Sequence, residues 1–295
     1  MTSTSPSHTI SASARQRGLA LGLLGVAAFS VTLPATRVAV ASLDPVFVGL
    51  GRAIVAALLA AIVLAVTRAP WPALALWPRL AIVAAGVVVG FPLLTAWAMQ
   101  HVPASHGAVV IGLLPLATAA AGAWFAHERP TTRFWLFAIA GSGIVVGFAA
   151  WQGGGTLHVA DLLLLGAVAC AAIGYAEGAR LTRLIGGWQV ISWALLLSAP
   201  VVAVPAWLAS GELAGVPWQA WAGFAYVSIV SMYVGFFAWY KGLALGGIAA
   251  VGQVQLLQPF LTIGSSALLL GETLDSSTLF AAALVIASIA LGRRS

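Results

Sequence analysis

The chain has 295 residues, of which 61% are hydrophobic and only 7% are charged. So few charges cannot cover the surface of a soluble globule of this size, and we therefore expect most of that surface to face the lipid bilayer. A net charge of +6 would suggest nucleic acid as a partner of a soluble protein. In a membrane protein the positions of the charges matter more than their sum, and we expect no nucleic-acid partner.

Taken in chain order, residues 1–16 are rich in Ser and Thr and predict a disordered cytoplasmic tail, followed by an uncleaved first helix. Apolar runs then recur to the end of the chain, each long enough to cross a hydrocarbon layer of about 30 Å as a helix. They predict an all-α polytopic membrane protein with ten transmembrane helices. The predicted ranges are 17–38, 45–67, 79–100, 103–126, 132–151, 159–182, 187–209, 217–240, 247–270 and 276–292.

The basic residues predict the orientation of these helices. With the N-terminus in the cytoplasm, eleven of the 13 Lys and Arg residues fall on the cytoplasmic side. They are Arg15, Arg17, Arg68, Arg79, Arg129, Arg133, Arg180, Arg183, Lys241, Arg293 and Arg294. Because basic loops stay in the cytoplasm, we expect both termini inside and the protein in the inner (plasma) membrane.

Two segments of the chain repeat the same pattern at a constant distance. Pro115 is followed 13 residues later by Glu128 in GLLPLATAAAGAWFAHERPT, and Pro259 is followed 13 residues later by Glu272 in QLLQPFLTIGSSALLLGETL. The two patterns predict five-helix repeats at 17–151 and 159–292, of opposite orientation because five is odd. Inverted repeats are typical of secondary transporters, whose substrate site lies near the midplane between the halves; a purely structural bundle is the alternative.

These motifs, with HERPT after the fourth predicted helix and GETL after the ninth, resemble the drug/metabolite transporter superfamily and its EamA-type members over residues 17–292. Length and an aromatic-rich second half make the chain similar to the YddG-type aromatic amino-acid exporters. The resemblance implies a basket of ten helices around a central cavity lined mainly by helices 1, 3, 4, 6, 8 and 9. His127 stands where the family usually has glycine, a departure that concerns loop packing.

The eighth predicted helix carries Tyr226, Tyr233 and Tyr240, spaced by seven residues. Such a stripe drifts by only about 20° per step, and its hydroxyls need a cavity or polar neighbours at membrane depth. We take Tyr233, nearest the middle, as a candidate substrate contact. Tyr226 and Tyr240 could equally be interfacial residues, and so could Trp239, which we also count as a candidate.

The ninth predicted helix carries Gln253, Gln255 and Gln258 ahead of Pro259. Gln255 and Gln258 are three residues apart, share a helix face, and are candidates to line the cavity; the alternative is that they bond to neighbouring helices. In the first repeat their counterparts are Ile111 and Leu114, and the counterpart of Tyr233 is Val89. Recognition of the polar end of a substrate should therefore depend on the second half.

Several ionisable groups lie within or near the predicted helices. Glu177, beside the candidate Tyr175, is costly in lipid, and we expect Arg180 or Lys241 to neutralise it as a structural pair. His106 could titrate near neutral pH and is a candidate site residue, with a hydrogen-bonded packing role as the alternative. We expect a further group, Arg37, Asp44 and Arg52, to form an ion-pair cluster at the outer mouth.

Together these residues favour export of amino acids, especially large neutral or aromatic ones, by alternating access. Tyrosine and glutamine offer stacking and hydrogen bonds to a zwitterion. Efflux of lipophilic cations or other metabolites is the alternative, and Glu177 would then have to contact the transported cation.

An enzyme is disfavoured because the sequence has no zinc-protease, nucleophile-elbow or phosphate-loop motif, and we expect no catalytic residue, cofactor or metal. A receptor or structural subunit is a third reading. Facilitated export is favoured over proton coupling through His106 or Glu177.

Overall fold

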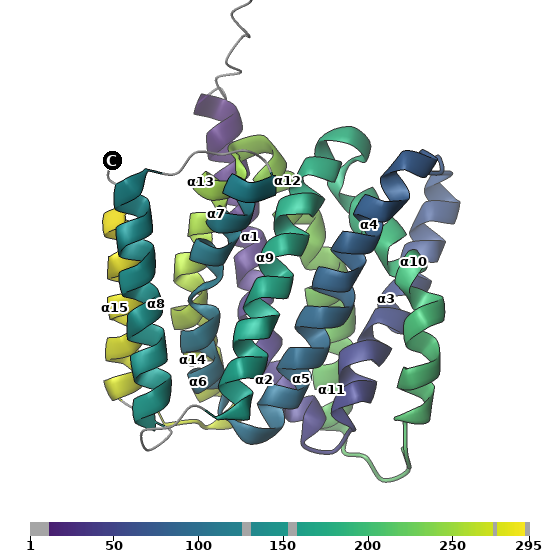
Figure 1. Cartoon of the computed structure of the whole chain (residues 1–295). Helices are drawn as coiled ribbons and strands as arrows, with labels where there is room; N and C mark the ends of the chain where they lie inside the picture. The colour runs from purple at the N-terminus through teal and green to yellow at the C-terminus, as the bar shows by residue number, and fades with distance from the viewer. Residues whose placement is uncertain (1–11, 126–130, 153–157, 274–275, 293–295) are drawn as a thin grey trace, which may run out of the picture.

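The computed structural model describes residues 12–125, 131–152, 158–273 and 276–292. Within these ranges every regular element is a helix, and Figure 1 shows the helices standing side by side as one bundle. Several features singled out from the sequence lie outside the described residues. They are most of the tail (1–11), His127, Glu128 and Arg129 of the HERPT motif, and the final arginines 293–294.

The first half of the chain forms ten helical elements. They are α1 (Ala12–Ser30), α2 (Thr32–Val40), α3 (Pro45–Thr67), η1 (Leu74–Leu76), α4 (Trp77–Val83), η2 (Ala84–Gly90), α5 (Phe91–His101), α6 (Ala104–Ile111), α7 (Leu114–Phe125) and α8 (Thr132–Gln152). The second half forms nine. They are α9 (Val159–Ile185), α10 (Gly187–Leu208), α11 (Trp218–Ala225), η3 (Tyr226–Val234), α12 (Gly235–Gly246), α13 (Ile248–Gly252), η4 (Gln253–Leu257), α14 (Gln258–Leu270) and α15 (Ser276–Gly292).

Seven helical runs among the described residues are long and apolar enough to cross a membrane. They are Ser13–Val40, Pro45–Thr67, Leu74–His101, Ala104–Phe125, Val159–Ile185, Gly187–Leu208 and Trp218–Gly246. These runs match the first four predicted helices and the sixth to eighth. The prediction of an all-helical, multi-pass membrane protein is therefore confirmed. The count of ten stays a prediction.

Several predicted helices are interrupted, and the interruptions follow the internal repeat. Two segments are π-helical, η2 and η3, and adding the repeat distance of 144 (from Pro115 to Pro259) to 84–90 gives 228–234, inside η3. The fourth predicted helix is broken at residues 112–113, just before Pro115, and η4 is a 3-10 turn just before Pro259. Such irregular turns are frequent at functional sites, and here both halves carry them at equivalent positions of the repeat.

Helix α1 of the first half packs against α12 of the second half along a row of glycines. A Cβ atom on Gly18 would lie 2.7 Å from the backbone nitrogen of Gly246, and one on Gly242 would lie 2.8 Å from that of Gly22. Only glycine allows two helix backbones to approach this closely, as is common in membrane bundles. The two halves are therefore in direct backbone contact along the first turns of α1.

Figure 1 shows the first turn of α1 and the last turn of α15 at the same end of the bundle. The end of α3, the beginnings of α4 and α8 and the end of α9 lie at that end as well. These are the helix ends that carry or adjoin Arg68, Arg79, Arg133, Arg180 and Arg183. These five arginines thus gather at one end of the molecule, whereas Arg37 and Arg52 do not.

Candidate functional site

A buried cavity lies where the two halves meet in the middle of the bundle. Its lining comes from α1, α2, α3, η2 and α5 of the first half and from α9, η3, α12 and α14 of the second. The lining residues are Phe29, Thr32, Arg52, Val87, Phe91, Tyr175, Ser231, Phe236 and Gln258. Its free volume is only about 20 Å³, close to what one water molecule needs. The cavity is therefore closed in this conformation.

Two residues at equivalent places in the repeat both line this cavity. Val87 lies in η2 and Ser231 in η3, and they are 144 positions apart, the same distance as Pro115 and Pro259. The first half contributes an apolar side chain here and the second half a hydroxyl. At this pair of positions the polar group lies in the second half, but Arg52 and Thr32 of the first half also line the cavity, so the polar groups do not come from the second half alone, contrary to the prediction from the sequence.

Arg52 lies inside the cavity wall, and the predicted ion-pair cluster with Arg37 and Asp44 is wrong. Asp44 instead caps α3, accepting hydrogen bonds from the backbone N–H groups of Val46 (2.7 Å) and Phe47 (3.2 Å). Arg37 lies 3.7 Å from a carboxylate oxygen of Glu272 and donates to the Met99 carbonyl at 2.9 Å. Arg52 stands about two helix turns after that cap, and its residue is only 2% exposed.

The Arg52 guanidinium is held by a short chain of hydroxyl groups. Its Nη2 atom donates to the Ser231 Oγ atom at 2.9 Å, and Ser231 Oγ lies 2.8 Å from Thr32 Oγ1. The Nε and Nη1 atoms are buried and have no hydrogen-bond partner among the described residues. The cavity thus contains a positive charge that is only partly satisfied by the protein.

Aromatic rings form the wall beside this charge. Phe29 and Tyr175 are stacked with ring centroids 6.4 Å apart, and Phe236 lies 5.1 Å from Phe29. Trp239 is fully buried behind them, with its ring 5.3 Å from Tyr175. Trp239 is therefore no interfacial belt residue; it supports the wall without lining the cavity, whereas Tyr175 lines it directly.

The three glutamines separate in space. Gln258 lines the cavity, and its Oε1 atom is buried without a partner, whereas the Gln255 Oε1 atom accepts from the Thr118 hydroxyl at 3.4 Å. Gln253 is buried as well, with an unpartnered Oε1. Gln255 lies in the 3-10 turn η4 and Gln258 opens α14, and of the two only Gln258 lines the cavity.

Each tyrosine of the predicted stripe finds a polar neighbour, as the buried hydroxyls require. Tyr226 donates to the Ala28 carbonyl (2.8 Å) and Tyr240 to the Gly174 carbonyl (3.2 Å). The Tyr233 hydroxyl lies 3.0 Å from the Ser192 Oγ atom of α10, and its ring packs on Phe237. In this conformation Tyr233 is not among the residues that line the central cavity.

Glu177 is 2% exposed in its side chain and is neutralised by two arginines. Arg180 Nη1 lies 2.8 Å from Glu177 Oε2, as expected from the i,i+3 spacing, and Arg79 Nε of α4 binds the other oxygen. Lys241, the alternative partner, forms no such pair with Glu177 in the described residues. The carboxylate is therefore engaged at one end of the bundle and does not line the cavity.

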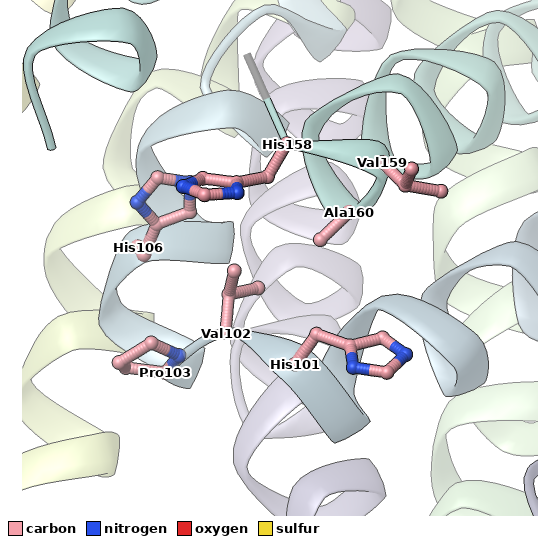
Figure 2. A pocket seen from close by; sticks show the side chains of 7 residues that line it. All are labelled: His101, Val102, Pro103, His106, His158, Val159 and Ala160. Carbon is pink, nitrogen blue, oxygen red and sulfur yellow. The ribbon is translucent and has the colours of Figure 1, made fainter. Parts of the chain in front are cut away.

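His106 lies at a different place, in an open pocket of about 640 Å³ between the end of α5 and the start of α9. Its Nε2 atom is 2.7 Å from the Asp161 Oδ1 atom, and both side chains are buried. Figure 2 shows His106 and His158 on one side of the pocket and His101 on the other. Among the described residues no three His, Cys, Asp or Glu side chains are arranged to hold a metal ion.

The structure therefore brings Tyr175 and Gln258 together at the central cavity and leaves Tyr233, Trp239, Gln255 and His106 outside its lining. The sequence reasoning missed Arg52, Thr32 and Ser231. The signal was present for Arg52, which stands seven residues after Pro45, about 10 Å along the helix. A cation at that depth in an apolar span is by itself a site signal.

Comparison with known proteins identifies the repeats. The model of the EamA-like transporter family matches residues 16–149 and again residues 158–292. A Bacillus subtilis (strain 168) protein described as "Uncharacterized transporter YdeK" is 48% identical over 276 residues, which cover 92% of this chain and 96% of that protein. A solved crystal structure with 17% sequence identity aligns with a TM-score of 0.70 over 95% of this chain and 97% of its own, a likeness of fold.

Proposed function

The chain belongs to the EamA-like transporter family of membrane transporters, and from this premise we propose that it exports amino acids, with large neutral and aromatic ones favoured. Export proceeds by alternating access between the two halves, with the central cavity as the substrate site. The repeat supports this location, because inverted repeats hold their substrate near the midplane at the interface of the halves.

The observation that carries the proposal is the composition of the cavity wall. Phe29, Tyr175 and Phe236 present aromatic rings, and Gln258 brings an unpartnered amide oxygen to the same space. Aromatic rings stack on an apolar or aromatic side chain, while the amide oxygen accepts a hydrogen bond from an ammonium group. A large neutral amino acid carries both groups on one small molecule.

The small volume of the cavity supports alternating access. A space of about 20 Å³ holds one water molecule at most, so an amino acid can enter only after the surrounding helices separate. The π-helical segments η2 and η3 lie next to the cavity in both halves. Turns of this kind leave backbone groups less regularly bonded and suit a helix that bends during such a movement.

Efflux of lipophilic cations, the alternative function, receives less support from the same residues. A cation site in a membrane needs an acidic or purely aromatic environment, and Glu177 is occupied by Arg79 and Arg180. The charge nearest the cavity is the positive Arg52. Repulsion between this guanidinium and a cationic cargo disfavours binding.

We further propose ten transmembrane helices, with both termini in the cytoplasm of a cell bounded by an inner (plasma) membrane. The basic residues at one end of the bundle support this orientation, since such residues stay on the cytoplasmic side. The common end of α1 and α15 in Figure 1 agrees with an even number of crossings.

The test is flux across liposomes that contain the purified protein. We expect phenylalanine, tryptophan and leucine to leave the vesicles faster than from protein-free liposomes, and ethidium or tetraphenylphosphonium to show no such acceleration. Facilitated export further predicts the same amino-acid flux with and without a pH gradient. Acceleration of the cations alone would contradict the proposed cargo, and flux that depends on the gradient would contradict the facilitated mechanism.

A further inference from the structure

Arg52 is the feature of the cavity that the proposed function leaves unexplained. Its residue is 2% exposed, and a guanidinium stays protonated under all conditions that proteins meet. One nitrogen donates to Ser231, while Nε and Nη1 have no acceptor in the described part of the chain. A charged group in the interior of a membrane protein is expensive, and it is expected to face a partner or a polar pathway.

The carboxylates of the described helices do not supply this partner. Asp161 lies against His106, Glu177 against Arg79 and Arg180, and Glu272 against Arg37. Glu272 also accepts hydrogen bonds from the backbone N–H groups at the start of α6. Asp44 caps α3. The anions that the fold places near the membrane interior are thus used, and the guanidinium remains uncompensated.

The groups around Arg52 indicate what the missing partner carries. The planar guanidinium binds carboxylates strongly because charge and paired hydrogen bonds act together. Gln258, on the same cavity, has a buried oxygen without a donor. A molecule with a carboxylate at one point, an ammonium group beside it and an apolar side chain would satisfy the guanidinium, the amide oxygen and the aromatic wall at once.

We propose that Arg52 is the anchor for the α-carboxylate of the transported amino acid, with the Gln258 amide oxygen accepting a hydrogen bond from its ammonium group. This inference rests on the proposed function and deepens it, because it names the part of the substrate that every cargo shares. The site then takes amino acids with a free carboxylate and discriminates against their amides and against amines without the carboxylate. Thr32 and Ser231 hold the guanidinium in place.

The first test needs no variant. Calorimetric titration of the purified protein with L-phenylalanine, L-phenylalaninamide, phenethylamine and 3-phenylpropionate compares ligands that share one aromatic ring. We expect the dissociation constant of phenylalanine to be lower than those of the amide and the amine by a factor of about ten or more, because only the carboxylate pairs with the guanidinium. Equal dissociation constants for the acid and the amide would overturn the proposal.

The second test assigns the preference to Arg52. Arg52→Gln should abolish the preference of the protein for phenylalanine over the amide, and Arg52→Lys, which keeps a charge but loses the fork, should retain part of it. Arg183→Gln removes one exposed arginine of α9 and is the matched control with an unchanged preference. Gln258→Leu should reduce the advantage of phenylalanine over 3-phenylpropionate, which lacks the ammonium group. A preference that persists in Arg52→Gln would overturn the assignment.

Flux and binding separate this inference from the proposed function. Arg52-dependent binding of carboxylates without amino-acid flux in liposomes would support the anchor and contradict amino-acid export. Amino-acid flux that is as fast for phenylalaninamide as for phenylalanine would support transport and contradict the anchor. Arg52→Gln protein is compared with wild type only after size-exclusion chromatography shows a monodisperse peak, and Arg52→Lys serves if the glutamine variant does not fold.

Discussion

Two regions of this molecule bury charge in opposite ways. Around Glu177, one carboxylate is enclosed by Arg79 and Arg180, so that opposite charges meet inside the protein. Around Arg52, one guanidinium meets only the hydroxyl of Ser231, and two of its nitrogens lack an acceptor. The difference indicates that the first group holds helices α4 and α9 together, whereas the second is kept ready for a ligand. The buried Asp161 carboxylate has a partner as well, the Nε2 atom of His106 at 2.7 Å.

We expect the largest effect on stability from removing the charge of Glu177, which Arg79 and Arg180 compensate. Glu177→Gln leaves two arginines facing each other without their shared carboxylate, and we expect the free energy of unfolding to fall by about 2–3 kcal/mol. The arginines are 29% and 37% exposed in their side chains, so water relieves part of the cost. Thermal unfolding in detergent measures the loss, and flux per folded molecule should stay near that of the wild type.

Glu212→Gln is the matched control for this change. Glu212 lies in an exposed segment between α10 and α11, and the same substitution there should alter the free energy of unfolding by no more than about 0.5 kcal/mol. If Glu177→Gln instead left the melting temperature unchanged and abolished flux, the carboxylate would belong to the transport pathway, and the comparison with Arg52 would fail.

The next effect has the opposite sign. Arg52→Met removes a buried charge that lacks a counter-ion and keeps much of the length of the side chain, so we expect the free energy of unfolding to rise by about 1–2 kcal/mol. Binding of phenylalanine should be lost in the same variant. A gain in stability at the expense of function is common where a site keeps a strained or uncompensated group. Thermal unfolding without ligand is the measurement, and a clear loss of stability would show that Arg52 serves packing.

The general architecture could be predicted from the sequence because it depends on properties of single segments, such as their apolar length and charge. Apolar length predicts the membrane spans, the positions of the arginines predict orientation, and the repeated pattern around Pro115 and Pro259 predicts the two halves. Each of these is a local property that tertiary contacts rarely override. The π-helical form of η2 and η3 was not predicted, since no residue type in those segments marks it.

The candidate site was only partly accessible, because it depends on contacts between distant residues. Asp44 and Arg52 are near in sequence and were paired for that reason, yet Asp44 stands directly before Pro45 and serves as a helix cap. Helix geometry then carries Arg52 about 10 Å into the bundle. Tyr233 finds Ser192, 41 positions away on α10, a partner that periodicity within one helix could not identify.

A smaller loss of stability is expected for Tyr233, whose hydroxyl contacts α10 and not the central cavity. Tyr233→Phe removes the hydroxyl that meets Ser192 at 3.0 Å, and we expect a loss of about 1 kcal/mol in the free energy of unfolding. Relative flux of tryptophan and threonine should be the same as in the wild type, because this hydroxyl contacts α10 in the closed conformation. A selective loss of tryptophan flux in this variant would place Tyr233 in the substrate site of another conformation.

An effect of similar size, on binding rather than on stability, concerns the Ser231 hydroxyl that holds Arg52. Ser231→Ala removes the one hydrogen bond that Arg52 makes within the described residues, together with the contact to Thr32. The guanidinium then gains freedom before the substrate arrives, and part of the binding free energy is used to orient it. We expect the dissociation constant of phenylalanine to rise by about fivefold, which corresponds to about 1 kcal/mol. The preference for phenylalanine over phenylalaninamide should persist, since the charge of Arg52 remains.

Ser198→Ala is the control, because the Ser198 hydroxyl is buried in α10 and donates to the Leu195 carbonyl away from the cavity. Equal binding by wild type and Ser231→Ala would mean that the aromatic wall alone positions Arg52, whereas loss of the preference for the carboxylate would show that Ser231, and not Arg52, recognises it.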